Sequence, residues 1–234
     1  MTVGIMQPYF LPYIGYWQLL AAVDRFVIYD NIQYTKKGWI NRNRFLRDGR
    51  DVYFTVPLKK ASDYLNVVER QLADDFDRDQ LLRTWSAAYR RAPHVGDVMP
   101  VLERIVRAPI GNLFEYVQHS IAEMASFLDI RTPMVVSSTV PIDHTLRAEQ
   151  KVLALCDALG ADRYLNPIGG VDLYSAAAFA AASVKLEFLR PRPREYTQLE
   201  HPFVPNLSIV DVLMFNSKAT VAEMLSEADV IAAV

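Results

Sequence analysis

Cysteine is almost absent from the sequence: Cys156 stands alone, so no disulfide can form within the chain. A lone thiol is typical of proteins in reducing compartments. No apolar run approaches the ~18 residues that a membrane-spanning helix needs, and no basic segment precedes the first apolar stretch. We therefore expect a soluble, cytoplasmic protein that makes no contact with membranes.

An excess of either charge is also missing. With 25 Lys and Arg against 27 Asp and Glu, the formal net charge is −2 and the sequence pI is about 6.1. Such a balance provides no overall field that would favour duplex nucleic acid or an anionic membrane. No H-x-x-x-H, C-x-x-C or carboxylate spacing indicates a metal ion, so we predict no metal site and no cofactor.

The 234 residues are 51% hydrophobic, enough for one substantial core. The first apolar stretches predict a strand over Val3–Met6, a helix over Trp17–Val23 and a strand over Arg25–Tyr29. A strand, helix and strand of this length indicate a parallel pair with a right-handed crossover.

The second half repeats this pattern with strands at Met134–Ser137, Arg163–Leu165 and Val184–Leu189. The helices between them are predicted at Leu146–Leu159 and Asp172–Ala182. The repetition predicts an α/β fold with a doubly wound, mainly parallel, nucleotide-binding-like sheet. A single domain over 1–234 with a helical insertion at about 73–130 accounts for the remaining pattern. Further expected elements are the strands Val52–Val56 and Leu65–Leu72, and the helices Gln80–Arg90, Asp97–Val106, Asn112–Leu128, Leu207–Phe215 and Val221–Leu225.

Two polar segments follow the first two strands, Gln7–Tyr16 and Asp30–Arg44. Ligands of parallel sheets bind beyond the carboxyl ends of the strands, so both segments should lie on one ligand-binding rim. The second segment is rich in cations and aromatic rings, which suit an anionic ligand with a flat face. A solvated cationic surface is the alternative. The expected ligand contacts here are Gln33, Tyr34, Lys36, Lys37, Trp39, Asn41, Arg42 and Asn43, with Lys59 close by in the sequence.

Two residues are candidates for a general base. Asp30 directly follows a predicted strand. His144 lies between a predicted strand and a predicted helix, and histidine titrates in the pH range in which a base can accept a proton from an amine. The alternatives are a turn aspartate that binds its own backbone and a segment in which Asp143 or Thr145 caps the helix.

A glycine-containing turn, Asn166–Gly170, connects another strand to a helix and leaves backbone amides free for an anion or a carbonyl oxygen. A tight structural turn is the alternative. Glu195 and Tyr196 follow the last predicted strand and are expected to close over the ligand. Cys156 falls on the apolar face of a helix, which favours a buried structural thiol.

Four motifs occur in order along the chain: MQPYFLPYIGYWQLL, YDNIQYTKKGWINRNR, LNPIGG-x-x-LY and EYTQ followed by FVPNLSIVDVLMFNS. Together they resemble the WbqC-like family over nearly the whole chain. Members occur in gene clusters for bacterial surface polysaccharide (O-antigen) and beside natural-product genes. The resemblance implies transfer of an aminoacyl group, glycyl in particular, onto an amino sugar. The donor would be a carrier-protein thioester or an aminoacyl-tRNA, and the acceptor an amine such as a nucleotide-linked amino sugar.

The start of the chain is also similar to the nucleotidylyltransferase superfamily, in which a strand is followed by His-x-Gly-His. Here Tyr13, Gly15 and Tyr16 occupy that motif, and a phenol cannot become the cation that a histidine supplies to a phosphate. The expected ligand contacts from this segment are Gln7, Tyr13, Gly15 and Tyr16. A nucleotidylyl- or adenylate-forming enzyme that uses ATP and Mg²⁺ stays open, as does a non-catalytic module that binds a carrier protein or tRNA.

Overall fold

The computed structural model describes residues 1–62, 64–192 and 194–233. Six strands of the described chain form one sheet in the order β5-β2-β1-β6-β7-β8. The first five are parallel, and β8 runs antiparallel to β7. This confirms the predicted α/β fold with a mainly parallel sheet. The strands are β1 (Thr2–Met6), β2 (Arg25–Ile28), β5 (Met134–Val136), β6 (Arg163–Pro167), β7 (Lys185–Pro191) and β8 (Ala228–Ala232).

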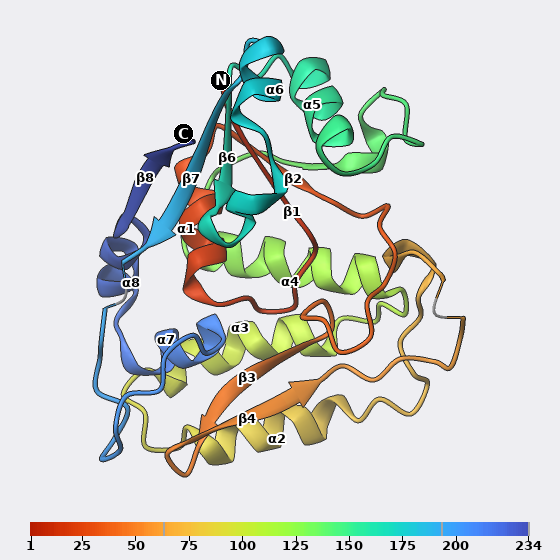
Figure 1. Ribbon diagram of the computed structural model, residues 1–234. Coiled ribbons are helices and arrows are strands. Elements are labelled where there is room, and N and C mark those ends of the chain that lie inside the picture. The colour runs from red at the N-terminus through yellow and green to blue at the C-terminus, as the bar shows by residue number, and fades with distance from the viewer. Residues whose placement is uncertain (63, 193, 234) are drawn as a thin grey trace.

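Helices cover both faces of this sheet (Figure 1). On one face lie α1 (Ile14–Ala22) and α8 (Lys218–Leu225), and on the other α5 (Ala148–Leu159) and α6 (Ala176–Ala181). The side chains of β2 alternate between two cores: Phe26 and Ile28 belong to one, and Val27 to the other. A strand buried on both faces reads as a continuous apolar run, which is why a doubly wound sheet could be predicted.

The parallel strands point toward a second half of the molecule, below the sheet in Figure 1. There the helices α3 and α4 lie under the strand ends, and a β-hairpin packs against α2 (Figure 1). The carboxyl ends of the strands therefore face this second half. Its elements are β3 (Arg42–Arg47), β4 (Arg50–Thr55), α2 (Arg78–Ala88), α3 (Val95–Arg107), α4 (Leu113–Phe127) and α7 (Ile209–Phe215).

The hairpin differs from the sequence prediction, because the end of the expected basic loop is strand β3. Asp48 and Gly49 link β3 to β4 with φ angles of 51° and 72°. Positive φ at both central residues is typical of the type I′ turn, whose usual sequences include Asp-Gly. The dipeptide was the available signal, and the cations around it concealed the strand.

Three other segments also differ. Leu65–Leu72 is not a strand: it contains a 3-10 turn, η1 (Val67–Glu69), held by a reciprocal capping box between Asn66 and Glu69. The predicted helix Asp172–Ala182 is divided into η3 (Ile168–Leu173) and α6, which Ser175 caps by accepting a hydrogen bond from Ala178 N. Strand β8 was not predicted, because its sequence, ADVIA, is short and half-exposed.

No helix of the described chain is both long and apolar enough to cross a bilayer. Within the same residues, no three His, Cys, Asp or Glu side chains lie together as a metal site would require.

Candidate functional site

The chain leaves β1 toward β2 on one side, while β6, on the other side of β1, carries the sheet onward to β7. A cavity of about 500 Å³ lies where the order reverses, beyond the carboxyl ends of β1 and β6. In open α/β sheets this reversal point is where ligands bind. We call the cavity the crevice; its polar and aromatic lining consists of Gln7, Tyr9, Tyr13, Tyr29, Thr35, Trp39, Asn166, Gly169, Gly170 and Tyr174.

The crevice has no formal charge: none of the described residues that line it is Asp, Glu, Lys, Arg or His. Its walls offer phenol hydroxyls, carboxamides and aromatic faces instead. Aromatic faces bind the flat surfaces of sugars and bases, and neutral donors and acceptors orient them. The lining therefore suits a polar, uncharged ring.

One wall comes from the turn between β1 and α1. Helix α1 begins at Ile14, three residues earlier than predicted, and Tyr13 is its N-cap residue. A Cβ atom on Gly15 would lie 2.5 Å from Cε2 of Tyr13. Gly15 does not line the crevice; its missing side chain lets the Tyr13 ring lie across the first turn of the helix.

The opposite wall is the turn after β6. The Tyr164 hydroxyl donates a hydrogen bond to Asn166 Oδ1 at 3.0 Å, and Asn166 Nδ2 donates to Pro167 O at 3.1 Å. A Cβ atom on Gly170 would lie 2.2 Å from Asn166 Nδ2. Gly170 is therefore required to seat the Asn166 amide, whereas a Cβ on Gly169 would meet no atom within 4 Å.

The third wall is the turn around Gly38, which Arg42 braces. Arg42 Nε donates to Gly38 O at 2.9 Å and its NH2 group donates to Lys37 O. The guanidinium also lies 5.5 Å from the ring centre of Trp39 and 4.9 Å from that of Tyr53. Arg42 therefore acts on the crevice through the turn and through Trp39.

Lys36 and Lys37 are exposed in this turn, between the lining residues Thr35 and Gly38. Their backbone therefore adjoins the edge of the cavity, whose described lining carries no charge of its own. A ligand with a neutral ring and a phosphate can place the ring inside and the phosphate at this edge.

Asp30 and His144, the two predicted bases, do not line the crevice. Asp30 is 3% exposed, and its Oδ1 accepts hydrogen bonds from Ser137 Oγ at 2.6 Å and Ser138 N at 2.9 Å. His144 Nε2 donates to Val140 O at 3.0 Å, so Nδ1 accepts the bond from Asn31 Nδ2 at 2.9 Å. Both nitrogens of the neutral ring are occupied.

Asn31 joins these two residues to a third, Lys151 on α5, which the sequence analysis missed. Asn31 Oδ1 lies 2.9 Å from Ser137 Oγ and accepts a hydrogen bond from Lys151 Nζ at 3.0 Å. Lys151 is 4% exposed, and its Nζ lies 4.9 Å from the ring centre of Tyr29, a lining residue. Desolvation lowers the pKa of Lys151, against the opposing effect of Asp30. Its position four residues before Leu155, on the apolar face of α5, was the available signal.

Four predicted ligand contacts form hydrogen bonds within the protein and do not line the crevice. Tyr16 belongs to α1 and is fully buried, and its hydroxyl donates to Gln7 O. Asn41 accepts a hydrogen bond from the hydroxyl of Tyr34 and donates to Val56 O, and the buried Asn43 donates to Leu11 O. Their polar groups hold the chain in place rather than face a ligand. The structure therefore places Tyr16, Tyr34, Asn41 and Asn43 outside the lining of the crevice.

The remaining predicted residues lie outside the crevice. Gln33 is exposed and forms an isolated bridge with Asn66. Lys59 pairs with Asp74 at 2.6 Å, and Glu195 is exposed. The crevice therefore brings together six of the predicted contacts: Gln7, Tyr13, Trp39, Asn166, Gly169 and Gly170.

Tyr196 belongs to a buried network around Asp211 of α7. The Asp211 carboxylate accepts hydrogen bonds from Tyr196 at 2.7 Å, Gln198 at 2.7 Å and Tyr89 at 2.9 Å. Burial raises the pKa of Asp211 to about 6, although the three hydrogen bonds favour its ionised form. The EYTQ motif thus fastens the segment after β7 to α2 and α7.

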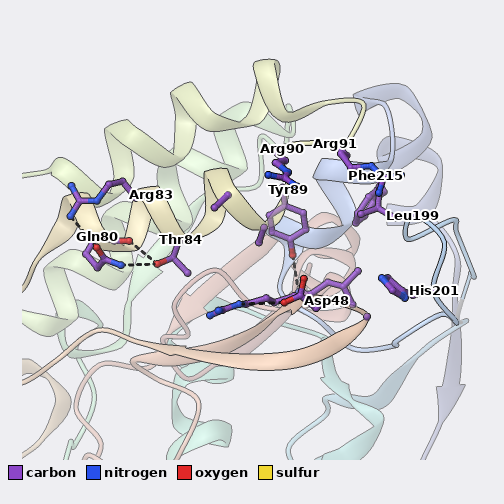
Figure 2. Close-up of a pocket in the computed structure, with 15 residues that line it drawn as sticks. Asp48, Gln80, Arg83, Thr84, Tyr89, Arg90, Arg91, Leu199, His201 and Phe215 are labelled. Atoms are coloured by element: carbon purple, nitrogen blue, oxygen red, sulfur yellow. Dashed lines mark hydrogen bonds and ion pairs between the residues drawn. The ribbon is translucent and has the colours of Figure 1, made fainter.

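A larger cavity, of about 630 Å³, lies at the turn of the hairpin beside α2. Figure 2 shows its arginines together with Gln80, Thr84 and His201. Three of the arginines that line it are engaged in ion pairs: Arg91 with Glu200 at 2.7 Å, Arg83 with Asp77 at 3.5 Å and Arg47 with Asp48 at 3.8 Å. This cavity does not lie at the carboxyl ends of the parallel strands, where ligands of such sheets bind, so we take the crevice as the candidate site.

Comparison with known proteins gives a consistent family assignment. The model of the WbqC-like protein family matches residues 7–223. The chain is also 28% identical over 228 residues to the uncharacterized protein Rv1507c of Mycobacterium tuberculosis (strain ATCC 25618 / H37Rv), a match that covers 95% of this chain and 96% of that protein. No solved structure is significantly similar to the chain. Since the family model spans nearly all of the sequence, the chain belongs to the WbqC-like protein family.

Proposed function

We propose that the protein is an acyltransferase that moves an activated amino acid, such as glycine, onto the amine of an amino sugar or a similar small metabolite. The observation that carries this proposal is the uncharged, aromatic crevice at the reversal point of the sheet, with Lys36 and Lys37 at its edge. A nucleotide-linked amino sugar matches this distribution of charge. The aminoacyl role itself is suggested by the family resemblance.

In this mechanism, the sugar ring stacks on Trp39, and hydroxyl and amide groups such as those of Tyr13 and Asn166 fix its orientation. The acceptor amine attacks the carbonyl carbon of the donor, so a C–N bond forms while the bond from that carbon to its carrier breaks. Backbone amides at the start of α1 and near Gly169 are suited to stabilise the oxyanion.

The attacking amine must also lose a proton, which the leaving group finally takes. Asp30 and His144 are engaged in the network around Asn31, so neither is placed to accept the proton directly. Lys151 lies in the same network and contacts Tyr29 of the crevice wall. We propose that Lys151, held by Asn31, positions the Tyr29 ring and supplies a positive charge behind this wall of the crevice.

A nucleotidylyl- or adenylate-forming enzyme is a second candidate, favoured by the sheet. Its order β5-β2-β1-β6-β7-β8 corresponds to 3-2-1-4-5-6, the order of dinucleotide-binding folds. The absence of cations among the described lining residues counts against triphosphate inside the crevice. A non-catalytic module for a carrier protein or tRNA is the remaining alternative.

Ligand-dependent thermal stability separates these candidates, because a ligand that binds only the native state raises the midpoint of unfolding. We expect a shift with amino-sugar nucleotides, and mass spectrometry should then detect the acylated sugar once an aminoacyl donor is added. A shift with ATP·Mg alone, followed by pyrophosphate release, would favour the second candidate. Binding of carrier protein or tRNA without any product would favour the third.

Trp39→Ala provides the test of the site. Loss of the stacking face should weaken sugar-nucleotide binding by roughly tenfold, or about 1.4 kcal/mol. Tyr64→Ala is the matched control, because Tyr64 is an aromatic residue that is 86% exposed and lies outside the crevice. Equal binding by both variants would remove the crevice as the acceptor site.

A further inference from the structure

A second cavity lies behind Tyr13. It has a volume of about 310 Å³ and is enclosed by α1, α8, the end of β7 and the segment 203–207. Most of its wall is apolar, from side chains that include Ile14, Phe203 and Leu207. Its size and lining suit a narrow, largely apolar part of a ligand.

One polar group inside this wall has no partner. Gln18 of α1 lines the cavity and is 1% exposed. Its Nε2 donates to Met224 O at 2.8 Å and Glu227 O at 3.0 Å, which fixes the amide. Its Oε1 accepts no hydrogen bond from any described residue. A buried carbonyl oxygen is costly to leave unpaired, and this one has almost no accessible surface, so a ligand N–H or O–H reaches it only when the Gln18 wall of the cavity opens slightly.

The outer edge of the cavity is cationic. Arg190, Arg192 and Arg194 line it, with side chains that are 58%, 61% and 40% exposed. Each is in an ion pair with a surface carboxylate: Arg190 and Arg192 with Asp229, and Arg194 with Glu223 and Glu227. Exposed ion pairs of this kind are weak, so a phosphate can compete for these guanidinium groups.

The second cavity and the crevice share a wall. Tyr13 lines both of them. In the turn after β6, Ile168 lines the second cavity, while its neighbours Pro167 and Gly169 line the crevice. A reactive group at the inner end of one cavity is therefore adjacent to the contents of the other.

We propose that the second cavity binds the donor of the acyl group through a phosphopantetheine arm. An amide N–H of the arm donates to Gln18 Oε1, its methylene groups lie along the apolar wall, and its phosphate binds the arginines at the edge. The acceptor amine in the crevice attacks the thioester carbonyl, a C–N bond forms, the C–S bond breaks, and the departing thiolate takes the proton of the amine. The identity of the arm as an acyl donor rests on the function proposed above.

Direct binding tests this site without any turnover. The probes are 4′-phosphopantetheine and coenzyme A, measured by calorimetry on the full chain. Ile14→Phe replaces an aliphatic side chain of the second cavity with a larger, aromatic one. It should weaken the binding of 4′-phosphopantetheine and coenzyme A at least tenfold. Ala22→Phe, on the exposed face of the same helix, is the matched control, and both it and Trp39→Ala should leave the affinity unchanged.

Arg194→Glu provides a second variant on an exposed side chain, in case Ile14→Phe lowers the midpoint of unfolding. It should weaken phosphopantetheine binding several-fold and leave unphosphorylated pantetheine unaffected. A carrier protein with and without its phosphopantetheine group then distinguishes the two sources of the arm. If only the loaded carrier binds, and coenzyme A does not, the source is a carrier protein.

Three results would overturn the proposal. The first is that phosphopantetheine binds in no form, and the second is that Trp39→Ala abolishes its binding while Ile14→Phe does not. The third is that 3′-aminoacyl-adenosine, and not pantetheine, binds at the site that Ile14→Phe affects. A sugar nucleotide that still binds the crevice in these experiments would leave the acceptor site of the proposed function intact.

Discussion

The same substitution by alanine should have different effects at two neighbouring glycines of the crevice, Gly169 and Gly170. Gly170→Ala would place a Cβ atom 2.2 Å from Asn166 Nδ2, so the amide must move. We expect destabilisation on the order of 1–3 kcal/mol and loss of ligand binding, because overpacking forces a shift of the wall. Gly169→Ala meets no atom within 4 Å and should be close to neutral. Urea denaturation and ligand-induced thermal shifts measure the two effects.

A double variant provides the control for this mechanism. Asn166→Ala removes the obstructing amide, so Gly170→Ala should cost much less stability in that background than in the wild type. If Gly170→Ala lowers the free energy of unfolding equally in both backgrounds, a contact other than the one with Asn166 excludes a side chain at position 170.

Asp211 predicts a dependence of stability on pH. Its pKa is about 6 in the folded protein and near 3.8 in the unfolded chain, so the folded state holds the proton more strongly. Its contribution to stability is therefore complete below about pH 4 and is lost as the pH rises through about 6, a change of about 3 kcal/mol. The free energy of unfolding of wild type relative to Asp211→Asn should fall by roughly this amount between these limits. Parallel pH profiles for the two proteins would contradict it.

At the scale of residues, the sequence located the turn Asn166–Gly170 but did not separate the carboxamides that line the crevice from those that brace the chain. Asn166 lies near the carboxyl end of β6 and Trp39 lies in the segment between β2 and β3, and both line the crevice. Asn41 and Asn43 occupy the same polar segment but hydrogen-bond backbone carbonyls of Val56 and Leu11. A sequence does not reveal which distant carbonyl lacks a donor, so a bracing amide and a ligand-binding amide look alike.

The hairpin β3–β4 acts on the crevice as an element, since Arg42 at its start holds the turn around Gly38. Arg42→Gln removes the guanidinium that lies against the Trp39 and Tyr53 rings, and its hydrogen bonds to the turn. We expect sugar-nucleotide binding to weaken by roughly tenfold with only a small change in the midpoint of unfolding. Calorimetric titration measures the affinity.

Arg47→Gln is the matched control on the same strand, because Arg47 is exposed and its contact with Asp48 is long, at 3.8 Å. Its affinity for the ligand should equal that of the wild type. If both arginine variants weaken binding alike, the effect comes from the overall charge of the hairpin and not from the braced turn.

Most of the elements that the sequence predicted are buried on both faces or amphipathic over several turns; β4 and β5 were predicted although they are partly exposed. Helix α4 is an example, with Asn112 as its N-cap and an apolar stripe that includes Leu113 and Val117. Strands β3 and β8 were missed because their side chains are mixed and partly exposed, so their pairing depends on partners distant in the sequence. For β8 that partner is β7, which ends nearly forty residues earlier.

At the scale of the whole molecule, the reactivity of Cys156 measures how readily the layer that α5 forms over the sheet opens. Its thiol is fully buried, and burial raises its pKa to about 12, so the reactive thiolate is scarce. We expect a disulfide reagent to label the native protein slowly, at a rate that rises with urea in step with unfolding. Cys156→Ala provides the blank. Rapid and complete labelling without denaturant would show that this layer opens independently.

Tyr13 has a consequence for the molecule that goes beyond its place in either cavity. A ring shared by two binding sites couples them whenever a ligand on one side changes its position. Thermodynamic linkage then requires reciprocity: the factor by which a sugar nucleotide changes the dissociation constant of phosphopantetheine must equal the factor in the reverse titration. Substitution of Gly15 by alanine would displace the ring, so it should alter this common factor from both sides at once.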